Sequence, residues 1–167
     1  MKANPDFMSL FSLCGFDHFV KVVEAAMRIN GSHILALNLL EWWWDSTNSF
    51  HFPWGEMTVT PHDFSVITGL RFTQSVVPVN GSINPLHPLA LELLGPVCAL
   101  LGDKEYVSTN ALRKGLTMPE STMAQKVRIV ALILISLCLA PDKTCETRTH
   151  LRYLPALEDL SQVRDFD

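Results

Sequence analysis

The sequence predicts a mainly α fold: a single globular multi-helix domain with one small β-hairpin near residues 50–59. A length of 167 residues suits one domain of ordinary size. Hydrophobic residues make up 48% of the chain and charged residues 18%, which is enough apolar material for a core and too little charge for a disordered chain. Apolar side chains recur at helical spacing in several segments, whereas residues 50–59 have the pattern of two short strands around a turn.

The first helix is expected over residues 16–29, because apolar residues fall on one face there at helical spacing. Asn30 and Gly31 both tolerate a left-handed backbone and predict its end. Ser32 is placed to cap a second helix, which is expected from residue 33 to about residue 44. This second helix is so apolar that it is expected either to be central or to face a partner.

A β-hairpin is expected after the second helix. Ser-Thr-Asn at residues 46–48 interrupts the helical pattern. Two short strand-like runs follow, at residues 50–52 and 57–59, on either side of a Pro-Trp-Gly-Glu turn at residues 53–56.

A strong helix start follows the hairpin. Thr60 can accept a hydrogen bond from the backbone N–H three residues on, Pro61 suits the first helical position, and Asp63 can reach back as in a capping box. Gly69 predicts the end of this helix.

The next segments are shorter and less regular. Residues 71–88 are expected to be extended with turns, because they contain three prolines and an Asn-Gly pair. Residues 89–101 are apolar, and Gly-Pro at residues 95–96 is expected to split or end a helix there. Ser108 and the two residues after it are expected to cap a short helix that ends at Lys114.

The longest helix is expected to open at Pro119 and Glu120 and to run to about Leu139. Four leucines then recur at helical spacing, and Pro155 is expected to force a boundary among them. These leucines are Leu151, Leu154, Leu157 and Leu160.

The charge and the hydropathy pattern argue against two classes of partner. The net charge is −4, and the chain has only 13 Lys and Arg from which to build a basic face, so charge gives no support for nucleic-acid binding. The most apolar run, residues 129–140, is shorter than the roughly 20 residues that a membrane span needs. A buried core helix is the better interpretation, and no membrane partner is expected.

The cysteines predict neither a zinc site nor a disulfide framework. Cys14, Cys98, Cys138 and Cys145 include no Cys-x-x-Cys pair. Cys138 lies in an apolar run and is expected to be a buried thiol. Free cysteines of this kind are typical of a reducing compartment.

No catalytic motif is recognisable, so the chain is not expected to be an enzyme. His51 and His62, with Glu56 or Asp63, do not match a strong metal-ligand spacing, and no metal is expected. Nucleophile-elbow and phosphate-binding glycine motifs are absent. Glu56 has the most open role, because it follows Gly55 between two aromatic-rich stretches, and an acid–base pair of Glu56 with His51 is the enzymatic alternative.

All four tryptophans lie in residues 42–54. On a helix, Trp42, Trp43 and Trp44 would point about 100° apart, so they cannot all face one core. One interpretation places two tryptophans in the core and one over the hairpin. The other leaves one exposed as an interaction anchor, since Trp is enriched in binding hot spots.

The chain resembles the plant mobile domain family. The first matching block runs from Leu-Leu-Glu-Trp-Trp at residues 39–43, through Phe-His and Gly-Glu-Met-Thr, to Gly-Leu at residues 69–70. A second block covers residues 139–157. The residues that carry the first block, and that the resemblance implies to be structural or interaction residues, are Glu41, Trp43, Thr47, Phe50, His51, Gly55, Glu56, Met57, Thr58, Asp63, Gly69 and Leu70.

The chain also departs from the family pattern. Trp42 stands where the family often has Arg. A Trp-Gly-containing helix that generally follows the second block is not found before Asp167. Residues 1–167 are therefore expected to form one plant-mobile-domain-like domain without that helix.

The resemblance implies a transposon-related plant nuclear protein, with the cytosol as the alternative location. It implies a non-enzymatic protein-interaction module linked to meristem maintenance, genome integrity and transposon silencing. It also implies a protein partner that is itself phosphatase-like. The family's "aminotransferase-like" label suggests pyridoxal phosphate, but no lysine here has a recognisable cofactor setting, so no cofactor is expected. A transposon-derived DNA-binding domain is the remaining alternative.

Overall fold

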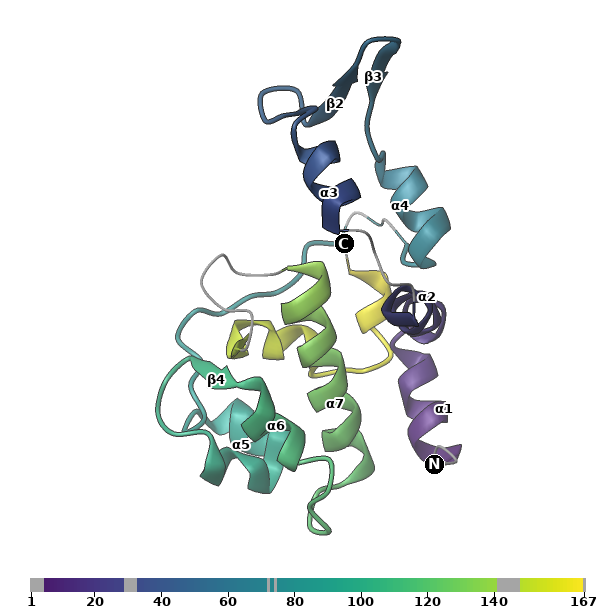
Figure 1. The fold of residues 1–167 in the computed structure, drawn as a ribbon. Coiled ribbons are helices and arrows are strands. Elements are labelled where there is room, and N and C mark those ends of the chain that lie inside the picture. Colours follow the sequence, from purple (N-terminus) through teal and green to yellow (C-terminus); the bar gives the residue numbers. More distant parts are fainter. Residues whose placement is uncertain (1–4, 29–32, 72, 74, 141–147, 167) are drawn as a thin grey trace. The chain divides into compact units, whose positions relative to one another are not determined.

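The structure is a computed structural model that describes residues 5–28, 33–71, 73, 75–140 and 148–166. The chain forms two compact units. Unit 1 comprises residues 1–16 and 73–167, and unit 2 comprises residues 17–72. Helices dominate the described residues and the sheets are small and antiparallel, so the expected mainly α class with a small hairpin is confirmed (Figure 1).

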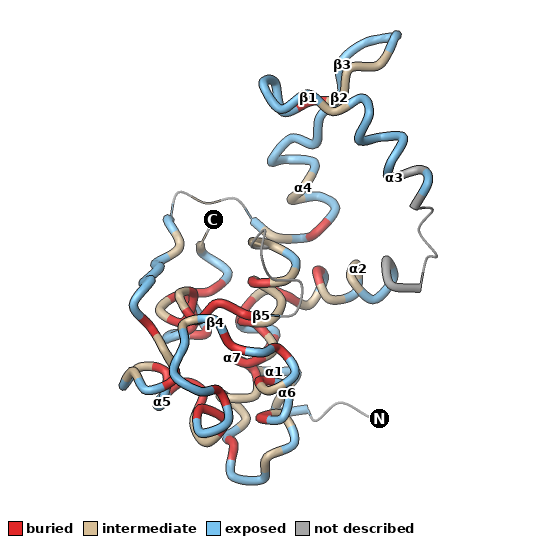
Figure 2. The backbone as a smooth tube through the Cα atoms, turned by 60° about the vertical axis from the view of Figure 1, so that its left-hand side comes forward, coloured by how far each residue is buried: buried red, intermediate tan, exposed pale blue. Residues whose placement is uncertain are grey.

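Unit 1 is built around helix α7 (Met123–Leu134). This helix contacts α1 (Pro5–Leu13), α5 (Pro88–Leu94) and the 3-10 helix η3 (Leu151–Leu157). The side chains of α7 that these neighbours bury most completely are Val127, Ile129, Ala131 and Leu132. Figure 2 shows the buried backbone concentrated along these elements and along β4 and β5.

The remaining elements of unit 1 surround this core. A two-stranded antiparallel sheet pairs β4 (Tyr106–Ser108) with β5 (Arg148–His150), and Thr109 and Thr149 share a buried hydroxyl hydrogen bond of 3.0 Å beside it. The other short elements are the 3-10 helix η1 (Gly95–Leu100), α6 (Thr109–Lys114), the π-helix η2 (Ile135–Leu139) and the 3-10 helix η4 (Val163–Asp165).

Arg128 on α7 hydrogen-bonds the C-terminal end of η3. Its Nε donates to the carbonyl of Leu157 at 2.8 Å, and its Nη2 donates to the carbonyl of Glu158 at 2.9 Å. These bonds satisfy carbonyl groups that a helix end leaves open. Burial lowers the pKa of the Arg128 guanidinium.

Most helices of the second half lie where the sequence predicts them, with two corrections. The break at Gly95 and the short helix ending at Lys114 are confirmed. The longest helix does not open at Pro119: it begins after Thr122, which forms a capping box with Gln125. The reason is that only the Thr-x-x-Gln pair satisfies two of the open N–H groups. Pro155 lies inside η3, so the boundary expected at Pro155 is not there.

Two further features of unit 1 differ from expectation. Cys138 is exposed, so the prediction of a buried thiol at Cys138 is wrong, whereas Cys14 and Cys98 are buried. Burial raises the pKa of the Cys98 thiol to about 11. Cys145 lies outside the described residues. Helix α1 was not expected from any sequence pattern, and its Phe11 is buried beside Phe16, with ring centroids 6.1 Å apart.

Unit 2 begins with the two predicted helices. Helix α2 (Asp17–Arg28) confirms the first, and its Phe19 is buried as its apolar face predicts. Helix α3 (His33–Leu40) ends four residues before Trp44, so the expected second helix is too long. The predicted stop and cap at residues 30–32 lie outside the described residues.

A three-stranded antiparallel sheet follows, in the order β1–β2–β3. Its strands are β1 (Trp43–Trp44), β2 (Ser49–Phe52) and β3 (Gly55–Met57). The predicted hairpin is confirmed, although its second strand starts two residues earlier than expected and a third strand joins it. Trp43 pairs with Phe50, and His51 pairs with Glu56. Because the tryptophans at residues 43 and 44 form a strand, they point to opposite faces of a sheet and not around a helix.

Helix α4 (Pro61–Thr68) closes unit 2 against α2. The Nε2 of His18 hydrogen-bonds the carbonyl of Ile67 at 3.1 Å. Gly69 ends α4 in a left-handed conformation with φ 73°, and a Cβ there would lie 2.8 Å from the Cβ of His18. Gly69 is thus required twice, by the backbone and by the close approach of α2. Among the described residues, no helix has the length and apolar character of a membrane span.

Gly69→Ala is expected to lower the free energy of unfolding of unit 2 by at least about 1–2 kcal/mol, the usual penalty for an L-residue in the left-handed region. The contact with His18 adds to this penalty. Urea unfolding followed by tryptophan fluorescence measures it, because every tryptophan of the chain lies in unit 2. Gly81→Ala is the control, since its Cβ would meet no atom within 4 Å. Equal stability of the two variants would contradict the prediction.

Candidate interaction surface

The three strands gather most of the aromatic side chains of unit 2. We call this group the aromatic sheet, and it consists of Trp42, Trp43, Trp44, Phe50, His51, Phe52 and Trp54. Three residues of the family-like motif, Trp43, Phe50 and His51, belong to the aromatic sheet, and a fourth, Glu56, pairs with His51 on the neighbouring strand. The aromatic sheet is therefore the place to look for a functional site.

One face of the sheet is a row of rings. The Trp43 ring lies edge-on to Phe50 at 4.9 Å, and Phe50 is stacked with Phe52 at 6.1 Å. Trp54, in the turn, stacks on Phe52 at 4.8 Å with an angle of only 4° between the planes, and Trp42 lies 5.8 Å from Phe52. Ring pairs of this geometry are worth roughly 0.5–1.5 kcal/mol beyond the area they bury.

The other face carries a polar cluster. The His51 ring stacks on Trp44 at 4.8 Å, and its Nε2 lies 2.9 Å from the hydroxyl of Thr47. That hydroxyl also lies 2.8 Å from the Oγ of Ser49, which is buried. An oxygen of Glu56 lies 3.7 Å from the same Nε2. Thr47, His51 and Glu56 of the motif are thus brought together.

The tryptophans are mostly exposed. Trp54 is 75% exposed, Trp44 56% and Trp42 40%, whereas Trp43 is only partly exposed. The interpretation that two tryptophans fill the core is therefore wrong, and the interaction-anchor interpretation gains three candidates. The physical reason is that Trp42 and Trp54 pack on Phe52 and Trp44 packs on His51, so each ring is covered by a neighbouring ring of the same small sheet and not by a core.

Backbone geometry explains other motif residues of the turns. Gly55 has φ 143°, a conformation that side chains disfavour, so the Gly of Gly-Glu-Met-Thr is needed for the turn. Asn48 is the non-glycine residue with positive φ among the described residues, and Thr58 donates to its carbonyl at 2.7 Å. Asn tolerates this conformation better than most residues. Ser-Thr-Asn at residues 46–48 predicted a break in the helix here, but the sequence did not indicate that Asn48 and Ser49 would hydrogen-bond Thr58 and Thr47.

Asp45 is another residue whose role the sequence did not indicate. Its Oδ1 accepts a hydrogen bond from the Trp43 indole at 2.7 Å, just after β1. This bond fixes the ring of Trp43 and leaves the carboxylate at the exposed edge of the sheet.

Asp63 acts as the expected cap. It accepts hydrogen bonds from the Thr60 backbone N–H at 3.0 Å and hydroxyl at 2.6 Å, while its own N–H donates to the Thr60 hydroxyl at 3.1 Å. The hydrogen bonds from Thr60 lower the pKa of the Asp63 carboxyl. The capping box predicted from the sequence is therefore confirmed.

The remaining motif residues lie outside the polar cluster. Glu41 is exposed in the turn after α3, and Met57 is 57% exposed on β3. Gly69 ends α4, and the N–H of Leu70 donates to the Thr68 hydroxyl at 3.2 Å. These positions frame the sheet and its connection to α4.

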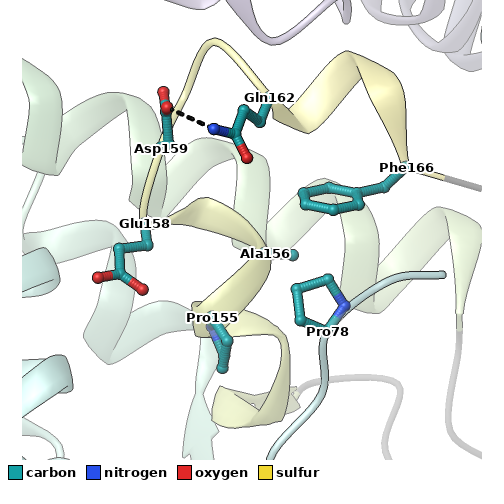
Figure 3. Close-up of a pocket in the computed structure, with 7 residues that line it drawn as sticks. All are labelled: Pro78, Pro155, Ala156, Glu158, Asp159, Gln162 and Phe166. Carbon is teal, nitrogen blue, oxygen red and sulfur yellow. Dashed lines mark hydrogen bonds between the residues drawn. The ribbon is translucent and has the colours of Figure 1, made fainter. Parts of the chain in front are cut away.

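The enzymatic alternative requires His51 and Glu56 to converge in an enclosed pocket. They do converge, but the Glu56 side chain is 62% exposed on an open sheet. A pocket of about 400 Å³ lies instead in unit 1, among residues of the C-terminal segment and Pro78 (Figure 3). Its lining residues are Pro78, Pro155, Ala156, Glu158, Asp159, Gln162 and Phe166.

Asp159 in that pocket serves local structure. Asp159 accepts hydrogen bonds from the N–H and hydroxyl of Ser161 at 2.9 and 2.7 Å, and from the amide of Gln162 at 3.0 Å (Figure 3). The hydrogen bonds from Ser161 are the main cause of the lowered pKa of the Asp159 carboxyl. These hydrogen bonds thus hold the Asp159 carboxylate in a turn. In the part of the chain that the structure describes, no three His, Cys, Asp or Glu side chains are grouped as metal ligands.

Comparisons with known proteins cover nearly the whole chain. The family model "Plant mobile domain" matches residues 15–166. The chain is 28% identical to Protein MAIN-LIKE 1 of Arabidopsis thaliana over 153 residues, which is 92% of this chain and 27% of that protein. It is 29% identical over 175 residues to Protein MAINTENANCE OF MERISTEMS of Arabidopsis thaliana, covering 99% of this chain and 35% of that protein.

A third relative has a different name. The chain is 32% identical over 140 residues to Serine/threonine-protein phosphatase 7 long form homolog of Arabidopsis thaliana, which is 78% of this chain and 10% of that protein. The chain thus spans about a third or less of the length of these curated relatives. No solved structure matches the chain significantly.

Thr60→Ala is expected to lower the free energy of unfolding by about 1 kcal/mol at neutral pH, as for other lost N-caps. The loss should shrink as pH falls through the lowered pKa of Asp63, because the folded state then loses the carboxylate that Thr60 serves. Thr122→Ala is the matched control, since its partner Gln125 does not titrate. Urea unfolding from about pH 7 to about pH 2 measures both. A loss at Thr60 that is independent of pH would contradict this assignment.

His51→Ala is expected to lower the free energy of unfolding of unit 2 by up to about 1 kcal/mol, because it removes the stacking on Trp44 and a cross-strand pair. Glu56→Gln should change it by less than about 0.5 kcal/mol, since exposed ion pairs contribute little. Urea unfolding by tryptophan fluorescence measures both variants. A larger effect at Glu56 than at His51 would show that the carboxylate, and not the ring stack, holds the cluster.

Proposed function

The chain belongs to the plant mobile domain family, and on that premise we propose that it is a non-enzymatic protein-interaction module whose contact surface is the aromatic sheet. The observation that carries the proposal is the exposure of Trp42, Trp44 and Trp54 on one small sheet. Trp is the residue most typical of binding hot spots, together with Tyr and Arg.

The geometry suits binding because the rings are already positioned. Trp54 is stacked on Phe52 and Trp44 on His51, so each loses little further freedom when a partner arrives. Immobilising a rotamer-rich side chain at an interface otherwise costs about 0.5–1.5 kcal/mol. Three exposed tryptophans gathered on the two faces of one small sheet are uncommon on a protein without a partner.

The relatives supply the cellular setting of the proposal. The name Protein MAINTENANCE OF MERISTEMS supports a role in meristem maintenance, and we extend the proposal to a transposon-related plant nuclear protein that acts in genome integrity and silencing. The relative named as a phosphatase supports a phosphatase-like protein as the partner. The chain spans about a third or less of the length of these relatives. Each relative therefore has further segments that this chain does not match and that contribute to the activity of the whole protein.

An enzyme that uses Glu56 and His51 as an acid–base pair is the second candidate. Their 3.7 Å approach favours it. The open, exposed position of Glu56 opposes it, because acid–base catalysis gains from a site that excludes water. The alternative of a transposon-derived DNA-binding domain has no comparable observation in its favour.

A pull-down from plant nuclei tests the interaction function. The chain is expected to recover a reproducible set of proteins, and Trp54→Ala should reduce that recovery by about tenfold or more, as truncation of a Trp hot spot does. Leu86→Ala is the control, because Leu86 is a similarly exposed apolar residue (66%) in unit 1. Circular dichroism checks that both variants fold.

The outcomes separate the candidates. Recovery that is equal in the Trp54 and Leu86 variants would remove the aromatic sheet from the proposal. A folded chain that recovers no protein would remove the interaction function itself. The second candidate, the acid–base pair, requires hydrolase or transferase activity that disappears in Glu56→Gln.

A further inference from the structure

The charge around the aromatic sheet has one sign. Residues 42–59 include Asp45 and Glu56 but neither Lys nor Arg. Asp and Glu also outnumber Lys and Arg across the whole of unit 2, residues 17–72. Both Asp45 and Glu56 are exposed, so their carboxylates are accessible beside the rings.

The exposed indoles each keep a face open. Trp54 is covered on one side by Phe52, whose ring is nearly parallel to it with centroids 4.8 Å apart, and the Trp54 side chain is still 75% exposed. Trp44 is covered on one side by His51 at 4.8 Å and is 56% exposed. An indole face attracts a cation through its quadrupole, and Trp does so more strongly than Tyr or Phe.

His51 provides a precedent for this chemistry within the chain. Its ring stacks on Trp44, and its Nε2 approaches the Glu56 carboxylate at 3.7 Å. The planar, nitrogen-bearing ring of His51 therefore already contacts an indole with its face and a carboxylate with its Nε2. A guanidinium group, which is planar and always charged, combines the same two contacts more strongly.

From these observations we propose that the aromatic sheet binds a Lys- or Arg-bearing segment of a partner protein that passes over the edge of the sheet. One basic side chain lies over the open indole face of Trp54 in the ring row, and another lies over the open face of Trp44 on the opposite face. The carboxylates of Glu56 and Asp45 stand at the sheet edges between them. This inference rests on the proposed interaction function and names the chemistry of the partner. Opposite charge on the two surfaces steers their association and excludes acidic partners.

The same observations weigh against single-stranded nucleic acid. Nucleic-acid sites also stack bases on aromatic side chains, but they combine that stacking with a basic groove along the phosphates. The aromatic sheet has carboxylates where such a groove has Lys and Arg. Phosphates would therefore be repelled by the groups that attract a basic peptide.

Binding of defined peptides to the full chain tests the inference. The probes are a 12-residue peptide of alternating Arg and Ser, and matched peptides with Lys, Glu or norleucine in place of Arg. Intrinsic tryptophan fluorescence reports binding, because every tryptophan of the chain lies in residues 42–54. The Arg and Lys peptides are expected to bind and to weaken with added salt, whereas the Glu and norleucine peptides should not bind.

Variants at Trp54 separate cation binding from apolar contact. Trp54→Leu keeps the apolar bulk without an aromatic face and should weaken the Arg peptide about tenfold, while Trp54→Phe should retain part of the binding. Glu56→Gln should weaken it and flatten its salt dependence. Leu86→Ala in unit 1 is the control and should bind as the unaltered chain does.

Several results would overturn the inference. They are equal binding of the Arg and norleucine peptides, equal binding by Trp54→Leu and Trp54→Phe, tighter binding of a 12-nucleotide oligo-dT than of the Arg peptide, and no binding of either basic peptide. If basic peptides fail while the nuclear pull-down still depends on Trp54, the interaction function stands and only the partner chemistry is wrong. If the pull-down fails as well, both fall.

Discussion

The pairing of β2 with strands on both of its sides is the constraint on which unit 2 depends. Only Ser49–Phe52 contacts both neighbours, and its register sets Trp43 against Phe50 and Glu56 against His51. A shift of one residue would exchange the two faces, because side chains alternate along a strand. The ring row and the polar cluster would then both be lost.

This register also divides two kinds of chemistry between the two faces. Phe50 and Phe52 carry the ring row to Trp54. On the opposite face, His51 links Trp44, Thr47 and Glu56. One short sheet therefore presents aromatic surface on both sides, with carboxylates at its edges. The proposed function and its proposed partner both follow from that division.

The sheet is held by conventional elements of unit 2. The capping box of Thr60 and Asp63 fixes where α4 begins, and Gly69 fixes where it ends and how closely α2 approaches. Asp63 and Gly69 belong to the family-like motif but do not lie in the polar cluster. Their roles are structural, which explains why one motif contains residues with such different chemistry.

The sequence by itself determined the mainly α class, the hairpin, the capping box at Thr60 and the helix stop at Gly69, because each depends on residues within a few positions along the chain. Only the tertiary structure decided that the tryptophans at residues 43 and 44 form a strand, since ring contacts with β2 outweigh their local helical pattern. The same holds for the cluster at His51. Strand register brings Thr47 and Glu56 to the Nε2 of His51 and Ser49 to the hydroxyl of Thr47, and no spacing in the sequence specifies these contacts.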